Sequence, residues 1–449
     1  MLAIFSDVAR VQRMLDVEAA LAQAQAQCSV IPAPAAAAIV GACNAIHIDF
    51  DALAQAAANA GNLAIPLVTQ LTARVAARDP EAAKFVHWGA TSQDIIDSGL
   101  MLQLRDALAA IDSDLASLNA ALALLARRHQ HTVMIGRTWM QHALPVTFGL
   151  KAAGWLDALV RHRQRLGHLR AASLALQFGG AAGTLASLGT DAAPVAAALA
   201  ARLELPLPDL PWHAQRDRLV EMATVLGALV GTLGKMARDI SLLSQTEIAE
   251  VAEPAASGRG GSSAMPHKRN PVGCAIALAA AVRVPPLVAT MLASMVQEHE
   301  RALGGWQAEW DTLPLIFQLC SGALQQMQIV ASGLVIDEAR MRSNLDATHG
   351  LIFAEAVSMA LAERVGRTGA HALVEDACHR AIDSGIPLRT TLAVDAVRDP
   401  EATSALTNQQ LDSLFDPQRY IGQAAAMVDR VLQTYQAGLP AQAGASTKE

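Results

Sequence analysis

Aromatic and charged residues are scarce in this chain of 449 residues. Phe, Trp and Tyr together make up 4% of the sequence and charged residues 17%, whereas apolar residues, rich in Ala and Leu, reach 52%. β-Sheets favour aromatic and β-branched residues, while Ala and Leu are among the best helix formers. The composition therefore argues against a sheet protein and predicts closely packed helices.

Cysteines are few and follow no pairing pattern. The five are odd in number, scattered and never in a CxxC pair: Cys28, Cys43, Cys274, Cys320 and Cys378. This spacing excludes the usual zinc motifs and a disulfide framework. We therefore expect free thiols in a reducing cytoplasm and no metal site.

An excess of positive charge and an N-terminal targeting pattern are both lacking. Lys and Arg number 34 against 41 Asp and Glu, for a net charge of −7, and no basic stripe predicts a nucleic-acid partner. Residues 1–7 show no basic segment followed by an apolar one, so no signal peptide is indicated. The uncharged stretch 314–336 contains several glutamines and serines, which makes it a poor membrane span. We expect neither a nucleic-acid nor a membrane partner.

Long apolar helical patterns dominate what is present. Helices are predicted over 106–128, 146–170, 215–252 and 272–296. The third would be about 57 Å long at 1.5 Å per residue. Apolar helices of this length cannot bury themselves in one chain, so a bundle shared between copies is predicted.

The length of the chain indicates more than one domain. The helical pattern shortens near Gly350, and the tail from Ala437 is rich in small residues. We predict an N-terminal helical domain over 1–105, a central long-helix bundle over 106–350 with a mobile loop at 256–271, and a small C-terminal helical domain with a loose tail over 351–449.

One segment combines serines, glycines and basic residues immediately before a helical pattern. Residues 261–271 read GSSAMPHKRNP. Pro271 suits the first helical position, and free backbone N–H groups at that start, beside Lys268, would bind a small anion. Ser262 and Ser263 lie where a mobile loop could carry them onto a substrate. The alternative is a plain Gly/Ser turn before an ordinary helix.

This eleven-residue segment resembles the signature loop of the fumarase/aspartase superfamily. Three further segments resemble family regions in the same order, HWGATSQD at 87–94, GRTWMQHALP at 136–145 and QFGGAAGT at 177–184. The resemblance implies a mostly α-helical three-domain fold whose long bundle tetramerises into a twenty-helix core. It also implies active sites built from three subunits, with site residues far apart within one chain, and no metal or organic cofactor.

The resemblance assigns roles to the loop. Ser262 matches the general base that moves a proton at the carbon alpha to a carboxylate. A free hydroxyl is too weakly acidic for this, so Lys268 and oriented N–H groups would lower its pKa. Lys268 and Asn270 would hold a carboxylate and stabilise an enolate-like intermediate, and Ser263 would bind substrate. A structural hydroxyl at Ser262 and a solvated lysine at Lys268 are the alternatives.

Further binding candidates come from the other two signature regions. Thr91 and Ser92 precede a helix start and would be either helix caps or carboxylate ligands, of which the resemblance favours ligands. Thr138 and Gln141 are similar candidates. His87 has a family counterpart near the site, although a packed structural histidine explains it equally well.

Two departures from the family pattern bear on the reaction. Trp139 stands where fumarase and adenylosuccinate lyase carry a histidine that helps protonate the leaving group. We predict that Trp139 binds substrate. The acid that supports that histidine is replaced within 273–275. Both losses indicate a cycloisomerisation, in which the group that leaves during ring opening is a stable carboxylate. His142 and His213 remain as proton-donor candidates, though structural histidines would explain both.

The segment ERALGGWQAEW at 300–310 replaces the Ser-rich, phosphate-binding segment of adenylosuccinate lyases. Arg301 could clamp a carboxylate with two hydrogen bonds, whereas Trp306 and Trp310 could be core packing. We therefore predict a homotetrameric cycloisomerase that acts on a small tricarboxylate. The alternatives are a β-eliminating enzyme like adenylosuccinate lyase and a non-catalytic relative like the lens crystallin of this superfamily.

Overall fold

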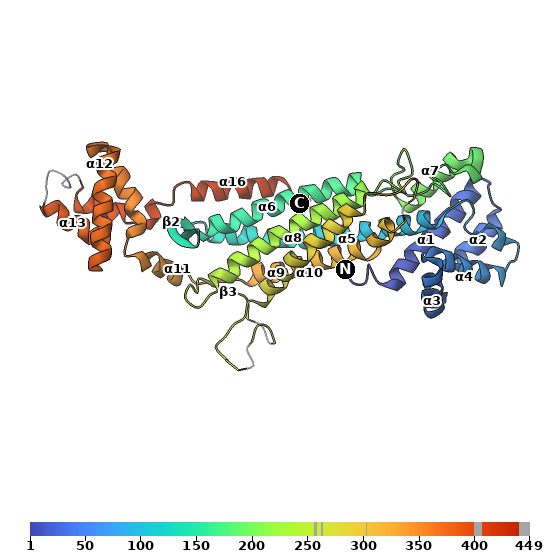
Figure 1. Ribbon diagram of the computed structural model, residues 1–449, viewed down its shortest axis with the longest axis horizontal. Helices are drawn as coiled ribbons and strands as arrows, with labels where there is room; N and C mark the ends of the chain where they lie inside the picture. The colour runs from blue at the N-terminus through green and yellow to red at the C-terminus, as the bar shows by residue number, and fades with distance from the viewer. Residues whose placement is uncertain (256–257, 262–263, 302, 399–405, 440–449) are drawn as a thin grey trace, which may run out of the picture. The chain divides into compact units, whose positions relative to one another are not determined.

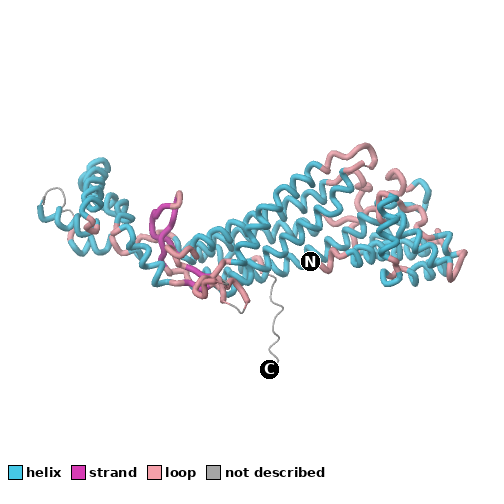
Figure 2. The backbone as a smooth tube through the Cα atoms, turned by 60° about the horizontal axis from the view of Figure 1, so that its bottom comes forward, coloured by secondary structure: helices cyan, strands magenta, loops and turns pink. Residues whose placement is uncertain are grey.

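The chain is mostly helical, as its composition predicts (Figure 1). The computed structural model describes residues 1–255, 258–261, 264–301, 303–398 and 406–439. Five long helices run side by side in both views: α5 (Ser92–Arg128), α6 (Phe148–Ala172), α8 (Asp217–Leu243), α9 (Val272–Ala293) and α10 (Gly305–Gly333) (Figures 1 and 2).

Two compact units divide the chain, and each takes residues from all five long helices. The first comprises Met1–Leu115, His162–Leu233 and Ala279–Gln325, and the second comprises Ala116–Arg161, Gly234–Leu278 and Gln326–Glu449. Each unit is therefore assembled from segments that are distant in the sequence.

The first unit packs short helices around α1 (Asp7–Gln27). The others are α2 (Ala33–Ala42), α3 (Phe50–Ala60), α4 (Ala64–Ala76) and α7 (Ala192–Leu203). Ser6 starts α1 by accepting the Ala9 N–H, and Asp49 does the same for α3 through Ala52. α1 packs against α2 and α7, and its apolar face is buried at Leu15.

The second unit contains a β-hairpin and the C-terminal helices. The hairpin joins β1 (Val133–Thr138) to β2 (Gln141–Thr147), and β3 (Val251–Ala252) pairs with β4 (Val335–Ile336). The remaining helices are α11 (Glu338–Leu345), α12 (Ala354–Ser384), which is broken at Gly366, α13 (Leu388–Arg398), α15 (Asn408–Leu414) and α16 (Ala424–Ala437). α11 packs against β1, which holds the hairpin in this unit.

Several predicted helix boundaries are wrong: the helix predicted from 106 already begins at Ser92, and the one predicted to run to 296 ends at Ala293. The helix predicted from 146 starts at Phe148, because Val146 and Thr147 pair with β1 and the Thr147 hydroxyl accepts the Leu150 N–H. The helix predicted to run to 252 ends at Leu243. Beyond it, the carbonyl groups of Glu247 and Ile248 accept hydrogen bonds from Arg340, so tertiary contacts replace the helical ones.

Three long helices leave apolar surface uncovered in this chain. By length and composition, α5, α8 and α9 are apolar enough to cross a membrane, yet only 39%, 56% and 28% of their most apolar windows are buried. Val282 on α9 is 76% exposed and Leu124 on α5 is 68% exposed. Such faces need a further partner, since monomers seldom expose large apolar patches.

A glycine fixes how closely α6 approaches the end of α5. A Cβ at Gly149 would lie 2.6 Å from the Gln130 Cα and 2.6 Å from the His129 carbonyl oxygen. The Gly149 N–H donates to that same oxygen at 2.8 Å. This contact therefore requires a residue without a side chain.

We expect Gly149→Ala to destabilise the protein by about 1–3 kcal/mol or more, because backbone atoms must move apart. Gly154→Ala on the same helix is the matched control, since its Cβ would meet nothing within 4 Å. It should gain up to about 1 kcal/mol from helix propensity. Thermal unfolding of both variants checks this, and equal midpoints would contradict it.

Candidate functional site

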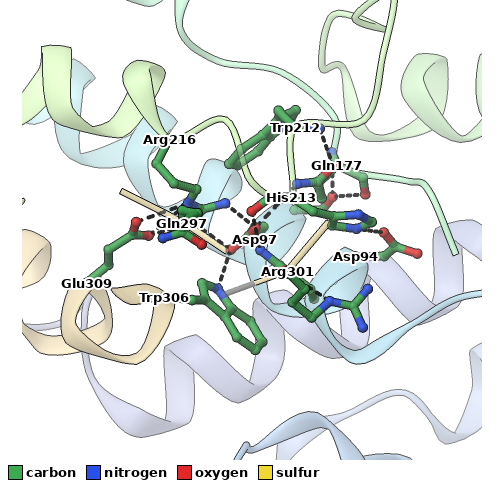
Figure 3. Close-up of polar contacts among 12 residues, drawn as sticks. Asp94, Asp97, Gln177, Trp212, His213, Arg216, Gln297, Arg301, Trp306 and Glu309 are labelled. Carbon is green, nitrogen blue, oxygen red and sulfur yellow. Dashed lines mark hydrogen bonds and ion pairs between the residues drawn. The ribbon is translucent and has the colours of Figure 1, made fainter. Parts of the chain in front are cut away.

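The start of α5 gathers five predicted site residues, which we call the α5 cluster: His87, Thr91, Ser92, His213 and Arg301. Within this cluster, the Asp94 carboxylate binds His213 (Figure 3). It accepts hydrogen bonds from the Thr91 N–H at 3.0 Å, from the N–H groups of Gly179 and Gly180 at 2.9 Å each, and from His213 Nε2 at 2.7 Å. Asp94 is 1% exposed, so these donors satisfy a charge that water does not reach.

This arrangement separates the positioning residues of the cluster from those that can reach a ligand. His213 is 3% exposed and bound to Asp94, so it belongs to the buried scaffold. Thr91 and Ser92 are half-buried, and their hydroxyls have no hydrogen-bond partner in the described part of the chain. Those hydroxyls are available to a carboxylate.

A second buried carboxylate lies one helical turn further along α5. Asp97 accepts from Arg216 Nη1 at 2.7 Å and from Trp306 Nε1 at 3.1 Å, while Glu309 accepts from Arg216 Nη2 at 2.6 Å (Figure 3). Burial raises the pKa of Glu309, and Arg216 only partly offsets this. Trp306 is 4% exposed and packs edge-on against Trp310. This network anchors α10 to α5.

His87 forms a close pair with a carboxylate that the motifs do not reveal. Its Nδ1 lies 2.6 Å from Glu18 Oε1, and Glu18 is 1% exposed. Burial lowers the pKa of His87, but the charge and hydrogen bond of Glu18, together with the charge of Asp94, outweigh burial and raise it above 6.5. His87 also has a φ of 60°, a left-handed conformation that is uncommon for a histidine.

Thr138, Trp139, Gln141 and His142 lie on the hairpin. Thr138 pairs with Gln141, and the two-residue turn between them is Trp139–Met140, with φ values of 51° and 64°. Turns with two positive φ values normally use Asn-Gly, so this one is strained. Trp139 is 97% exposed and Met140 is 70% exposed. A strained turn therefore presents a bare indole to its surroundings.

His142 lies opposite Arg137 on this hairpin. Its Nδ1 has no hydrogen-bond partner among the described residues. Burial lowers the pKa of His142, and the positive charge of Arg137 lowers it further, with a smaller opposing effect from Glu250. At neutral pH the imidazole is therefore uncharged and can accept a proton more readily than donate one.

Lys268 and Asn270 line a pocket of about 820 Å³, which we call the loop pocket. Lys268 is exposed, whereas Asn270 helps close the loop: its N–H donates to the Gly260 carbonyl at 2.8 Å. A Cβ at Gly260 would lie 2.7 Å from the Asn270 carbonyl oxygen, so this closure needs glycine. Ser262 and Ser263 lie outside the described residues.

The prediction that free N–H groups at the start of α9 bind an anion is wrong. The N–H groups of Gly273 and Cys274 donate to the carboxylate of Glu253 at 3.0 and 2.8 Å. Arg259 also contacts this carboxylate at 3.3 Å. An internal anion therefore fills the helix terminus, and Lys268 remains exposed in the loop before it.

Glu18 and Glu253 are positioning residues that the motif analysis missed. Glu18 lies on the apolar face of α1 between the buried residues Val17 and Ala20, and an acid in such a place is a usable signal because acids are rarely buried unpaired. Glu253 gives no comparable signal, since nothing in its sequence neighbourhood indicates that it turns back onto α9. Among the described residues, no group of three or more His, Cys, Asp or Glu side chains could hold a metal ion.

We expect the Glu18–His87 pair to stabilise the fold more at acidic than at alkaline pH. The pKa of His87 is higher in the folded chain than in the unfolded chain, where it is about 6.5. The pair therefore contributes its full stabilisation below about pH 6.5, and this contribution is lost as the pH rises through the folded-state pKa. Glu18→Gln should therefore cost about 1–3 kcal/mol near pH 5.5 and less near pH 9. Thermal midpoints across this range test the expectation, with the exposed His47→Gln as control. A difference that does not change with pH would contradict it.

Comparison with known proteins identifies the family of this chain. Residues 1–285 match the family model described as lyase, and residues 350–431 match that of the adenylosuccinate lyase C-terminus. A 3-carboxy-cis,cis-muconate cycloisomerase of Pseudomonas aeruginosa is 57% identical over 97% of this chain and 94% of its own length. A nitrosuccinate lyase of Streptomyces davaonensis is 44% identical over 96% of this chain and 91% of its own length.

A solved structure extends the likeness to the fold. The crystal structure of 3-carboxy-cis,cis-muconate lactonizing enzyme from Pseudomonas putida is 54% identical to this chain. It aligns with a TM-score of 0.92 and covers 97% of this chain and 96% of that one. The chain therefore belongs to the lyase family within the fumarase/aspartase superfamily, which its four signature segments resemble.

Proposed function

We propose that this chain catalyses the conversion of 3-carboxy-cis,cis-muconate to 4-carboxymuconolactone, a step of protocatechuate degradation. The observation that carries the proposal is 57% identity, over nearly the full length, to a cycloisomerase of that name. The hairpin and the start of α9 also support the proposal. Other family members protonate a poor leaving group with a histidine and a supporting acid, which are replaced here by Trp139 on the hairpin and within 273–275 at the start of α9.

The reaction is an intramolecular addition followed by a proton transfer. A carboxylate oxygen of the substrate bonds to a carbon of the diene, and the displaced electron pair moves to the carbon alpha to another carboxylate. That carbon then takes a proton, which completes the lactone. Ser262 delivers this proton and regains one from water; in the ring-opening direction it removes the same proton.

Lys268 and Asn270 stabilise the charge that builds up on the carboxylate next to the alpha carbon. Preorganised donors at such a charge typically contribute a few kcal/mol each, because they need no reorganisation during the reaction. Both line the loop pocket, and Lys268 is exposed there. Ser263 adds a binding hydroxyl.

The other substrate carboxylates are held by the remaining candidates. The Thr91 and Ser92 hydroxyls and the Arg301 guanidinium are the donors of the α5 cluster, and His87, paired with Glu18, offers its imidazole. Thr138 and Gln141 offer donors from the hairpin. Trp139 provides an apolar wall against the diene, and His142 accepts or relays a proton.

The supporting acid of other family members is replaced within 273–275, and the structure shows crowding at the first of these positions. A Cβ at Gly273 would lie 2.6 Å from Arg259 Nη2 and 2.6 Å from Val330 Cγ2, so a side chain there would have to displace one or both of them. A leaving carboxylate needs no strong acid, so the loss of that acid suits cycloisomerisation better than the expulsion of an amine.

We propose further that the chain forms a homotetramer with a twenty-helix core and active sites shared between subunits. The exposed apolar faces of α5 and α9 support this, because a helix bundle between copies would bury them. The exposed Trp139 on its strained turn supports it too, since another subunit would give the indole a binding partner. The five free cysteines are consistent with a cytoplasmic location.

A β-elimination is the second candidate, because a nitrosuccinate lyase is 44% identical to this chain. Trp139 and the loss of the supporting acid within 273–275 argue against an adenylosuccinate-type elimination. A non-catalytic crystallin-like role is the least supported, given that Ser262, Lys268 and Asn270 all match the family motif.

We expect the purified protein to abolish the diene absorbance of 3-carboxy-cis,cis-muconate. Ser262→Ala should slow this by about 10²–10⁴-fold, because the proton at the alpha carbon loses its carrier. Ultraviolet spectrophotometry measures both rates, with the product identified as 4-carboxymuconolactone. An unchanged spectrum with folded wild-type protein would reject the assignment and direct the search to adenylosuccinate and argininosuccinate.

We expect Val282→Glu to break the tetramer and abolish activity, since it places a charge in the helix faces that the copies would share. Within one chain Val282 is 76% exposed, so the monomer should tolerate glutamate. Met359→Glu, at a residue 63% exposed on α12, is the control. Light scattering without detergent gives the oligomeric state. A wild type that is an active monomer would overturn the proposal of shared sites.

A further inference from the structure

Gln93 lies in the first turn of α5 and is 1% exposed. Its side-chain oxygen accepts a hydrogen bond from Arg301 Nε at 3.1 Å. Its side-chain nitrogen donates to Asp97 Oδ2 at 3.1 Å and to the His213 carbonyl at 3.0 Å. The amide therefore joins Arg301 to the buried Asp97 network of Figure 3.

The chemistry of these neighbours permits only one orientation of the amide. Asp97 and the His213 carbonyl can only accept, whereas the Arg301 guanidinium can only donate. Rotating the amide by 180° would oppose oxygen to two acceptors and N–H to a donor. In a buried site each such mismatch is expensive, so Gln93 always presents its oxygen to Arg301.

Arg301 is held on one edge and free on another. Its Nη2 donates to the carbonyl groups of Gly180 and Ala181 at 3.4 and 3.1 Å, and its Nε donates to Gln93. Its Nη1 has no hydrogen-bond partner within the described ranges. An arginine side chain is flexible, so these contacts fix the direction in which the free N–H groups of Nη1 point.

The neutrality of Gln93 has a second effect. Asp97 already pairs with Arg216, and Gln93 stands between Asp97 and Arg301. Arg301 makes no ion pair with a described residue, so within the described ranges no carboxylate neutralises its positive charge. A glutamate at position 93 would keep the contact with Arg301 but would neutralise the positive charge of its guanidinium.

We propose that Gln93 is a positioning residue that aims the uncompensated guanidinium of Arg301 at a carboxylate of the substrate. This inference rests on the proposed function and deepens it, because it names what sets the carboxylate-binding geometry of the α5 cluster. Gln93 itself touches no substrate; it acts through Arg301.

The test compares four single variants and one double variant with the wild type in steady-state lactonisation kinetics. Gln93→Met keeps the side-chain length but removes the hydrogen bonds, and Gln93→Glu introduces the competing charge. Both should raise KM about tenfold to hundredfold and change kcat about threefold or less, since binding geometry and not proton transfer is disturbed. Gln103→Leu is the matched control on the same helix: it loses a hydrogen bond to Ile4 and should leave both parameters unchanged.

Arg301→Lys tests whether Gln93 acts through Arg301. If it does, Gln93→Met should add little to the KM of Arg301→Lys, because coupled residues are not additive. Independent effects that multiply would overturn the proposal, as would an unchanged KM in either Gln93 variant. Should Gln93→Met fail to fold, Gln93→Asn decides in its place, because its shorter uncharged amide withdraws the oxygen from Arg301 without opposing a charge to Asp97.

A binding measurement separates this inference from the proposed function. Calorimetry with butane-1,2,4-tricarboxylate, an unreactive tricarboxylate, should give a Kd that rises with the same Gln93 substitutions. If the wild type binds this probe but does not consume 3-carboxy-cis,cis-muconate, the proposed function fails while the Kd of the variants still tests Gln93. If the wild type binds neither this probe nor 3-carboxy-cis,cis-muconate, the proposed function and the role of Gln93 are both overturned.

Discussion

The buried carboxylate of Asp94 is the interaction on which the α5 cluster depends. Three backbone N–H groups and one imidazole converge on it, from the segment before α5, the glycine turn at 179–180 and His213. One charge therefore sets the relative positions of three segments that are up to 119 residues apart in the chain. The Thr91 and Ser92 hydroxyls and Arg301 owe their places to that common anchor, because each lies on or against a segment that Asp94 holds.

Much of the fold and part of the site could be predicted from the sequence. The helical character follows from an Ala- and Leu-rich composition, and the family loop, the helix start after Thr91 and the importance of 300–310 follow from motifs. The end of α8 could not be predicted, because Leu243 is followed by residues that the helical pattern tolerates. Hydrogen bonds from Arg340, about a hundred residues later, decide the boundary.

The same limit explains the errors within the site. A helix start rich in free N–H groups is a sound local expectation, yet Glu253 returns to fill it from outside the helix. The partner of His87 also comes from a distant segment, since Glu18 is 69 residues away. Local patterns name the groups that can do chemistry, whereas long-range contacts decide which of them are already occupied. Lys268 is exposed where it lines the loop pocket, so it is available to a ligand.

The crowding at Gly273 constrains substitution at the start of α9. A side chain at that position would have to displace Val330 or the guanidinium of Arg259, which contacts the carboxylate of Glu253 that caps α9. A larger residue there would therefore disturb the cap of the helix that follows Lys268 and Asn270. One missing side chain thus lets a single carboxylate close the helix end beside the loop pocket.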